Sequence, residues 1–103
     1  MFLANAFSLN MLAVDSANIN VKKVSIEEAR SLLNGNFESC VGHADTAALF
    51  SGLLGRPVPA NRSTLQLESG VELVVGQYTG PRLAEGTTTL PEGAAVTWFH
   101  VTL

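Results

Sequence analysis

The sequence predicts one α/β domain of the mixed α+β kind over residues 1–103, with two or three helices packed on a mixed five- to six-stranded sheet. The length of 103 residues fits a single domain. Apolar residues make up 47% of the chain and charged residues 15%, which allows a real core and argues against disorder. Strand-like runs are interspersed with helix start and stop signals, which favours a sheet with helices beside it.

The N-terminal part is predicted to contain two strands joined through a turn. Phe2–Asn5 is short and apolar, as buried strands are. Asn5–Asn10 mixes apolar residues with amide and hydroxyl side chains, which is typical of a structured turn. Asn18–Val24 is predicted as the second strand.

Two helices are predicted in the middle of the chain. Ser25–Glu28 reads S-x-x-E, a capping box that begins the first helix, and Asn34-Gly35 ends it. A short strand, Glu38–Val41, follows. Gly42–Asp45 opens the second helix, and Gly55 ends it. The apolar side of this second helix consists of Ala47, Leu49, Phe50, Leu53 and Leu54.

The C-terminal part is predicted to be mainly β-structure. Thr64–Glu68 and Val71–Gln77 are separated by Ser69-Gly70, a two-residue link that predicts a tight hairpin. A loop rich in Thr, Pro and Gly, Pro81–Gly93, comes next. Ala95–Thr102 is predicted as the last strand, and its mixed apolar character indicates burial on both faces and a central position in the sheet.

The charge balance limits the partners of the chain. Six Lys and Arg against nine Asp and Glu give a net charge of −3, with a pI near 5.2. Proteins that coat double-stranded DNA carry a basic face, so we expect no such partner. A small anion held in a focused pocket is compatible with this charge.

Metal ligands and membrane-inserting segments are scarce. Cys40 is the only cysteine, so the chain has no intrachain disulfide and no C-x-x-C site. The only histidines are His43 and His100, so we expect no metal site and no cofactor. The uncharged N-terminal run lacks a basic start and is shorter than the ~20 residues of a membrane span. We therefore expect a cytoplasmic chain with no membrane partner.

Polar residues that can carry chemistry gather just outside the ends of the predicted elements, where loops usually build sites. His43 opens a helix, where free N–H groups attract phosphate and a histidine can move a proton near neutral pH. Arg62 and Arg82 suit phosphate because a guanidinium donates two parallel hydrogen bonds. The other candidates are Asn5, Ser8, Asn10, Asn61, Gln77 and Glu85. Each also has a purely structural interpretation as a cap, a turn former or a surface charge.

Several common catalytic signatures are absent. The sequence contains no G-x-x-x-x-G-K, no G-x-G-x-x-G and no G-x-S-x-G. Its carboxylates are not clustered as a two-metal site requires. Any phosphodiester chemistry is therefore expected to be independent of metal.

Four blocks of sequence occur in one order: LANAFSLNML at residues 3–12, VGHADT at 41–46, NR at 61–62 and RLAEG at 82–86. Together they resemble the viral anti-CRISPR ring nucleases, a family also found in cellular genomes and proviruses. Members degrade cyclic tetra-adenylate, the second messenger of type III CRISPR defence. The resemblance spans nearly the whole chain, with the first block the most specific and Asp15–Glu38 the poorest match.

The resemblance implies a role for each matching residue. His43 falls on the catalytic histidine of the family, the general acid, and Arg82 and Glu85 fall on its arginine–glutamate pair. The ligand-contacting positions of the family correspond to Asn5, Ser8, Asn10 and Arg62. A family glutamine corresponds to Gln77 or has no counterpart, because the stretch Gly76–Pro81 is longer than in some relatives.

The resemblance also implies a mechanism and an oligomeric state. A ribose 2′-hydroxyl attacks its own phosphorus, the 5′-oxygen leaves, and linear di-adenylates with 2′,3′-cyclic phosphate ends are released. Arginines stabilise the developing charge, while His43 protonates the leaving oxygen. The family is a homodimer, and a two-fold axis matches a ring of four identical nucleotides.

Two alternatives remain open at this point. A sponge of the same fold would bind a cyclic nucleotide without cutting it, and only a turnover assay separates the two. A small viral structural or DNA-binding protein is the other alternative, against which the acidic pI counts.

Overall fold

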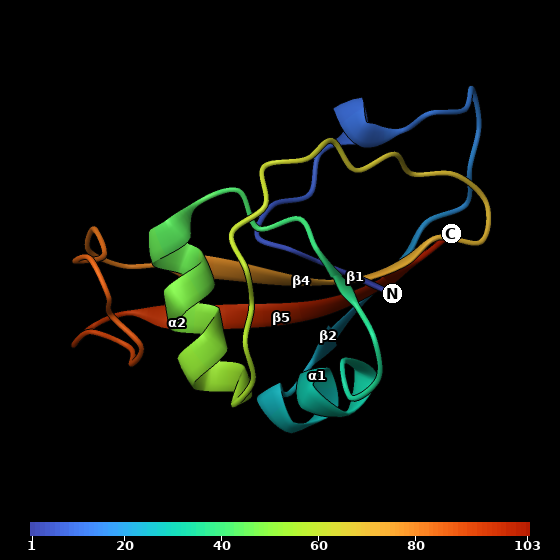
Figure 1. Cartoon of the computed structure of the whole chain (residues 1–103). Coiled ribbons are helices and arrows are strands. Elements are labelled where there is room, and N and C mark those ends of the chain that lie inside the picture. The colour runs from blue at the N-terminus through green and yellow to red at the C-terminus, as the bar shows by residue number, and fades with distance from the viewer.

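Five strands form one mixed sheet in the computed structural model, which describes residues 1–103 (Figure 1). The strands are β1 (Phe2–Ala4), β2 (Asn20–Val24), β3 (Glu38–Ser39), β4 (Glu72–Thr79) and β5 (Ala95–Thr102). The helices are α1 (Ile26–Leu32) and α2 (Ala44–Leu54), with a 3₁₀ turn, η1, at Leu9–Met11. The spatial order is β2-β5-β4-β1-β3. The predicted single α+β domain with a five-stranded mixed sheet and two helices is confirmed.

The sheet combines a parallel and an antiparallel half. β1 runs parallel to both β3 and β4, whereas β5 runs antiparallel to β4 and to β2. β5 has the predicted bounds and lies between β2 and β4, but it is not the central strand. Only Trp98 and Val101 of its eight residues are buried, so the predicted burial on both faces is wrong for most of the strand. Its neighbour β4 is the middle strand of the five. The N-terminal strand therefore pairs with a strand that is about 70 residues later in the chain, since Leu3 aligns with Val74.

The helices pack on one face of the sheet. Leu3, Val74 and Trp98 point to this face and join the buried residues of both helices in one core cluster. The Phe50 ring of α2 meets the Trp98 ring of β5 at a centroid distance of 4.9 Å and an interplanar angle of 51°. Gly76 of β4 lies directly beneath both rings, because a Cβ added there would approach Phe50 Cζ to 2.6 Å. The glycine is what lets α2 come this close to the sheet.

The opposite face is covered by loop segments and the short η1 turn instead of α-helices. In Figure 1, η1 lies on one side of the strands and α1 lies on the other. Leu65 and Leu67 are buried here against Leu73, Val75 and Val101. The predicted strand Thr64–Glu68 and its hairpin are therefore wrong. This segment is extended, but its Leu67 backbone bonds to Met11 and Ala13, and only an isolated bridge to Leu12 results. The alternation of leucines reflects a second layer over the sheet instead of a strand within it.

The bounds of four predicted strands also change. β1 ends at Ala4 instead of Asn5, and β2 begins at Asn20 instead of Asn18. β3 is limited to Glu38–Ser39, because the chain then turns toward α2. β4 extends to Thr79, so Gln77 lies inside the strand opposite Thr97 and not at a strand end. The strand stops where expected, at Gly80-Pro81, whose glycine has a φ of +147°.

Local signals at the helix ends are confirmed. Ser25 Oγ accepts a hydrogen bond from the Glu28 amide at 3.1 Å and caps α1. Gly55 ends α2 in the left-handed conformation, with φ of +71°. None of the helices has the length and apolar content that crossing a bilayer requires.

The close packing over Gly76 leads to a stability prediction. In Gly76→Ala the new methyl group collides with the Phe50 and Trp98 rings, which lie at 2.6 and 2.7 Å from its position. We expect the free energy of unfolding, measured by urea denaturation, to fall by about 1–3 kcal/mol.

Gly35→Ala is the matched control, because no atom lies within 4 Å of its added Cβ. We expect a change within about 0.5 kcal/mol for this variant. Equal stability of the two variants would contradict the packing described for Gly76.

Candidate functional site

The carboxyl ends of three parallel strands meet at one edge of the sheet. β1 ends at Ala4, which aligns with Val75 of β4, while Leu3 aligns with Ser39 of β3. β1 and β3 are adjacent, so the loop that begins at Asn5 and the segment that leads to His43 start side by side. Gln77 lies on β4 just beyond the same level. Sites in α/β proteins usually form at such an edge, where loops from neighbouring strands converge.

His43 is the N-cap residue of α2, and its imidazole is free. Its carbonyl accepts the first helical hydrogen bond, from Ala47 at 2.9 Å. Its side chain makes no capping bond and is exposed. The first amides of α2 carry a partial positive charge, which favours an anion beside the ring. A phosphate bound at this end would lie within reach of a proton donor.

A tethered loop holds Arg62 next to His43. The Asn61 amide donates to Val41 O at 2.8 Å, and Asn61 Nδ2 donates to Ser39 O at 2.8 Å. A Cβ built on Gly42 would lie 3.9 Å from Cα, Cβ and Cγ of Arg62. The stem of Arg62 therefore runs along the backbone that leads into α2. The structure places Arg62 beside Gly42, the residue before His43, although 19 positions separate Arg62 from His43 in the sequence.

Ser39 is a supporting residue that the sequence did not reveal. It is the one buried polar side chain of the chain. Its hydroxyl donates to Pro59 O at 2.6 Å and accepts weakly from the Val41 amide at 3.3 Å. The residue fastens the two segments that carry His43 and Arg62. A serine within a short apolar stretch was the only available signal.

The three polar residues after β1 have different surroundings. Ser8 caps η1, since its Oγ accepts from the Asn10 amide at 3.2 Å. Asn10 is exposed, and Asn5 is half-buried without a side-chain hydrogen bond. Ser8 therefore acts as a turn former, as its structural interpretation predicted. The side-chain amides of Asn5 and Asn10 make no hydrogen bond within the chain.

Arg82 and Glu85 lie in the loop that follows the carboxyl end of β4, between β4 and β5. Both are exposed, and no ion pair or hydrogen bond joins either of them to the other or to His43. Thr87 Oγ1 donates to Ala84 O at 2.7 Å and shapes the loop around Glu85. The loop reaches α2 at Thr88, whose carbonyl lies against Gly52. The β4–β5 loop and the helix that begins at His43 are therefore packed together (Figure 1).

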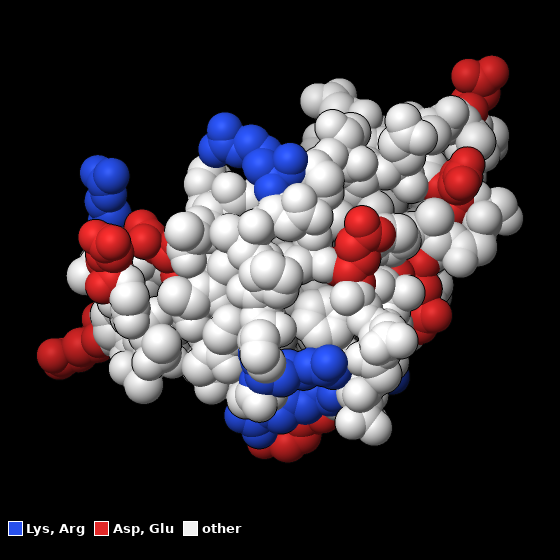
Figure 2. Space-filling view, viewed as in Figure 1, with Lys and Arg blue, Asp and Glu red and all other residues white.

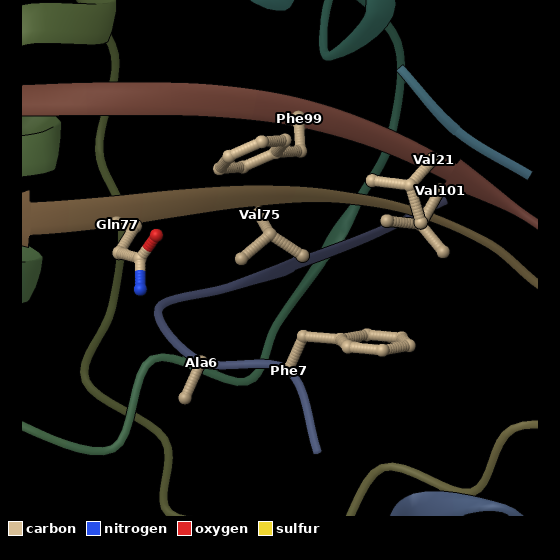
Figure 3. Close-up of a pocket in the computed structure, with 7 residues that line it drawn as sticks. All are labelled: Ala6, Phe7, Val21, Val75, Gln77, Phe99 and Val101. Carbon is tan, nitrogen blue, oxygen red and sulfur yellow. The ribbon is translucent and has the colours of Figure 1, made fainter. Parts of the chain in front are cut away.

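A hollow of about 230 Å³ opens on the loop-covered face, over β4 and β5. Figure 3 shows its lining: Ala6, Phe7, Val21, Val75, Gln77, Phe99 and Val101. Gln77 contributes the single polar side chain among these seven residues. Its amide lies at the end of the hollow near Ala6 (Figure 3). An apolar floor with one amide at its rim suits a flat heterocycle better than a bare phosphate.

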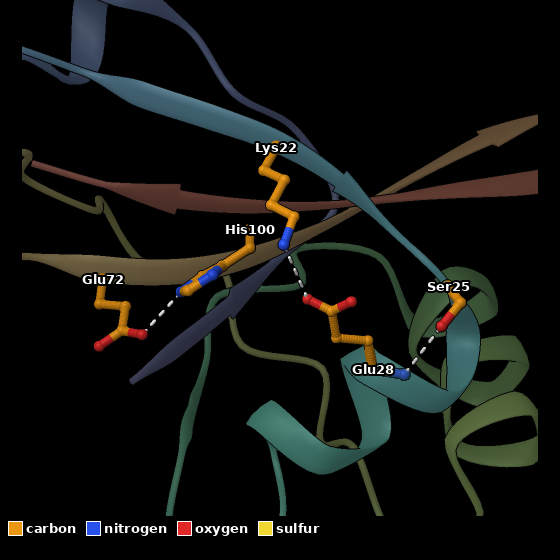
Figure 4. A network of polar contacts seen from close by, with 5 residues as sticks. All are labelled: Lys22, Ser25, Glu28, Glu72 and His100. Carbon is orange, nitrogen blue, oxygen red and sulfur yellow. Dashed lines mark hydrogen bonds and ion pairs between the residues drawn. The ribbon is translucent and has the colours of Figure 1, made fainter.

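The remaining titratable residues lie elsewhere. His100 contacts Glu72 at 2.6 Å on the helix-covered face, near the opposite end of the sheet (Figure 4). No group of three or more His, Cys, Asp or Glu side chains is arranged to hold a metal ion. His100 is a partly buried strand residue, as the sequence indicated.

Residues 1–95 match the protein-family model described as STIV B116-like. The chain belongs to the STIV B116-like family. It is 36% identical over 87 residues to ORF117 of the Acidianus two-tailed virus, covering 78% of this chain and 74% of that protein. It is 32% identical over 75 residues to protein 26 of a Sulfolobus islandicus filamentous virus, covering 72% of this chain and 64% of that protein.

The fold of this STIV B116-like chain has a solved counterpart. B116 of Sulfolobus turreted icosahedral virus superimposes with a TM-score of 0.81 and is 27% identical. The match covers 99% of this chain and 97% of that one. These relatives are viral proteins, which agrees with the viral part of the resemblance found in the sequence. Their names state no activity.

The charges of the STIV B116-like chain are scattered over the surface. On the face shown in Figure 2, Lys and Arg form separate groups with Asp and Glu among them. No continuous basic stripe runs across this face, as binding along a nucleic-acid duplex would require. Arg62 and the first amides of α2 are the positive groups near His43, and the Asp45 carboxylate lies in the same first turn.

The tether at Asn61 leads to a second prediction. Asn61→Ala removes the hydrogen bond to Ser39 O, which should lower the free energy of unfolding by about 0.5–1.5 kcal/mol. Hydrogen exchange should become faster at residues 39–43 and 59–62, because the two segments lose a link.

Asn36→Ala serves as the control, because Asn36 is exposed and its side chain makes no hydrogen bond. It should leave both the stability and the exchange pattern unchanged. Unaltered exchange at residues 39–43 in Asn61→Ala would rule out the tether as the support of the Arg62 loop.

Proposed function

We propose that the chain is a metal-independent ring nuclease that cleaves cyclic tetra-adenylate into linear di-adenylates with 2′,3′-cyclic phosphate ends. The product would no longer activate the effectors of type III CRISPR defence. One observation carries the proposal: an unbonded, exposed histidine stands at the start of an 11-residue helix beside an arginine. Phosphodiester cleavage needs an anion site and a proton donor at one place, and this edge offers both.

The chemistry divides between substrate and protein. The ribose 2′-oxygen forms a bond to its own phosphorus and loses its proton to water, while the bond from phosphorus to the 5′-oxygen breaks. Protonated His43 gives its proton to the departing 5′-oxygen, so no alkoxide is released. Arg62 and the first amides of α2 stabilise the negative charge that builds up on the phosphate oxygens. Because the nucleophile belongs to the substrate, the protein mainly holds it in line with the leaving oxygen.

The hollow on β4 and β5 supports a nucleotide over a simple phosphate. Its floor of Phe7, Phe99 and aliphatic side chains can take an adenine ring, and the Gln77 amide can bond to the edge of that ring. Asn5 and Asn10 are free to bind ribose or phosphate oxygens nearby. The distance along the chain between these groups is large, but all of them follow or lie on neighbouring strands.

We also propose that Arg82 and Glu85 act from the β4–β5 loop in a homodimer. The loop packs on α2, and neither residue has an ion pair that satisfies its charge. A two-fold dimer presents two His43 side chains to opposite phosphodiesters of a four-membered ring, and two cuts release two dinucleotides. The local cations offset the net charge of −3 where the ligand binds.

The direct test is incubation of the purified chain with cyclic tetra-adenylate in EDTA, with the products resolved by chromatography and mass. We expect linear di-adenylates to accumulate without added metal. A ring that is bound stoichiometrically but stays intact would instead identify a sponge. An intact ring with no binding would refute the proposed ligand altogether.

The two histidines provide a matched pair of variants. His43→Gln should reduce the rate of ring cleavage by roughly 10²–10⁴-fold, because the leaving oxygen loses its proton donor. Its affinity for the ring should stay close to that of the unaltered chain, since the imidazole makes no structural bond.

His100→Gln should keep full turnover, because His100 lies at the other end of the sheet. Single-turnover rates and equilibrium binding, measured for both variants, separate chemistry from affinity. Unreduced turnover in His43→Gln would remove His43 from the mechanism.

A further inference from the structure

The two outer strands of the sheet, β3 and β2, differ in how their outer edges are covered. At one edge, β3 is covered by the loop that carries Asn61, through the hydrogen bonds to Ser39 O and Val41 O. At the other edge, β2 pairs with β5 alone. None of the backbone groups of residues 20–24 takes part in any further hydrogen bond. The outer edge of β2 is therefore a row of unpaired N–H and C=O groups, which is a template for another strand.

The side chains of this edge follow a short pattern. Val21, Lys22, Lys23 and Val24 read apolar, basic, basic, apolar. Val21 is 54% exposed, which is unusual for valine in a strand. Lys22 reaches Glu28 of α1 at 3.7 Å but stays 66% exposed (Figure 4), and Lys23 has no ion pair. The edge thus offers two cations and an uncovered apolar residue.

Concave surface lies on both sides of the same strand. On the loop-covered side, Val21 is a wall of the hollow in Figure 3. On the helix-covered side, a groove of about 460 Å³ runs past the residues from Lys23 to Ile26. Its floor includes Trp98, its rim includes Arg30, and no acidic residue lines it. Alternate side chains of an added strand would therefore find space on either face.

We propose that β2 is a docking edge for an extended acidic segment of another protein, which adds to the sheet as a sixth strand. Backbone hydrogen bonds along β2 supply the common part of the affinity, and the side chains supply the selectivity. The segment that complements β2 reads apolar, acidic, acidic, apolar. This order is the same in both directions, so it suits parallel and antiparallel addition.

A second copy of the chain fits this edge poorly. Antiparallel pairing centred on Lys22 sets the two Lys22 side chains directly opposite each other, and pairing centred on Lys23 does the same for the two Lys23 side chains. Like charges in opposite positions destabilise a strand pair. The two lysines of the edge therefore favour a partner segment with carboxylates. They form a local basic site although the net charge of the whole chain is −3.

The probe is a capped hexapeptide with Val-Glu-Glu-Val at its centre, titrated into the full-length chain at low salt and followed by NMR. We expect saturable shifts in the backbone amides of residues 20–24 and slower hydrogen exchange there. The same peptide with N-methylated backbone amides should not bind, because it cannot donate to the edge. Binding should weaken as salt is added, since the charges are exposed.

A charge-swap experiment tests the selectivity. The double variant Lys22→Glu, Lys23→Glu should bind the acidic peptide at least tenfold more weakly, a loss of about 1.4 kcal/mol. It should gain binding to the matching Val-Lys-Lys-Val peptide. Lys23→Gln is a milder variant that retains the Lys22–Glu28 pair and should show an intermediate loss.

Three results would overturn the proposal. The first is the absence of shifts at residues 20–24 up to millimolar peptide. The second is equal binding of the N-methylated peptide, which would exclude strand addition. The third is self-pairing through β2. It would be detected as a change in the amide chemical shifts of residues 20–24 when the chain is diluted without peptide, and it would assign the edge to a second copy.

Discussion

The contact between Phe50 and Trp98 above Gly76 determines how the rest of the molecule is arranged. An aromatic pair of this kind contributes about 0.5–1.5 kcal/mol beyond the area that it buries. More importantly, the missing side chain of Gly76 fixes the distance between α2 and the middle of the sheet. Any larger residue would lift the helix. The direction and height of α2, and with them the position of its first residue, depend on this contact.

The candidate site follows from that placement and from the parallel half of the sheet. β1 and β3 end on the same side, so their loops start next to each other. α2 then starts directly after its N-cap His43, while hydrogen bonds of Ser39 and Asn61 fasten the Arg62 loop to the segment that leads into the helix. The polar residues that matter are few and mostly exposed. Backbone geometry and a few partly buried hydrogen bonds, rather than a charged core, give the site its shape.

Local signals in the sequence predicted local structure well. The Ser25–Glu28 capping box, the Gly55 stop and the bounds of the last strand were correct because each depends on neighbours in the chain. The alternation of Leu65 and Leu67 indicated an extended segment, but could not identify its partner, which lies over the sheet. The nearness of Arg62 to Gly42 likewise depends on hydrogen bonds across the β3 edge. The proposed roles of Arg82 and Glu85 rest on sequence resemblance, since no hydrogen bond or ion pair joins either residue to His43.

The position of the first strand has a consequence for how the chain folds. β1 lies between β3 and β4, and its pairing of Leu3 with Val74 closes a loop of about 70 residues. β1 therefore emerges from the ribosome long before its main neighbour exists. Topologies that are dominated by such distant pairings have a high contact order and fold slowly, because the entropy of loop closure is lost before the contacts form. The β4–β5 hairpin, whose strands are much closer in sequence, is the natural nucleus onto which β1 adds as a late step.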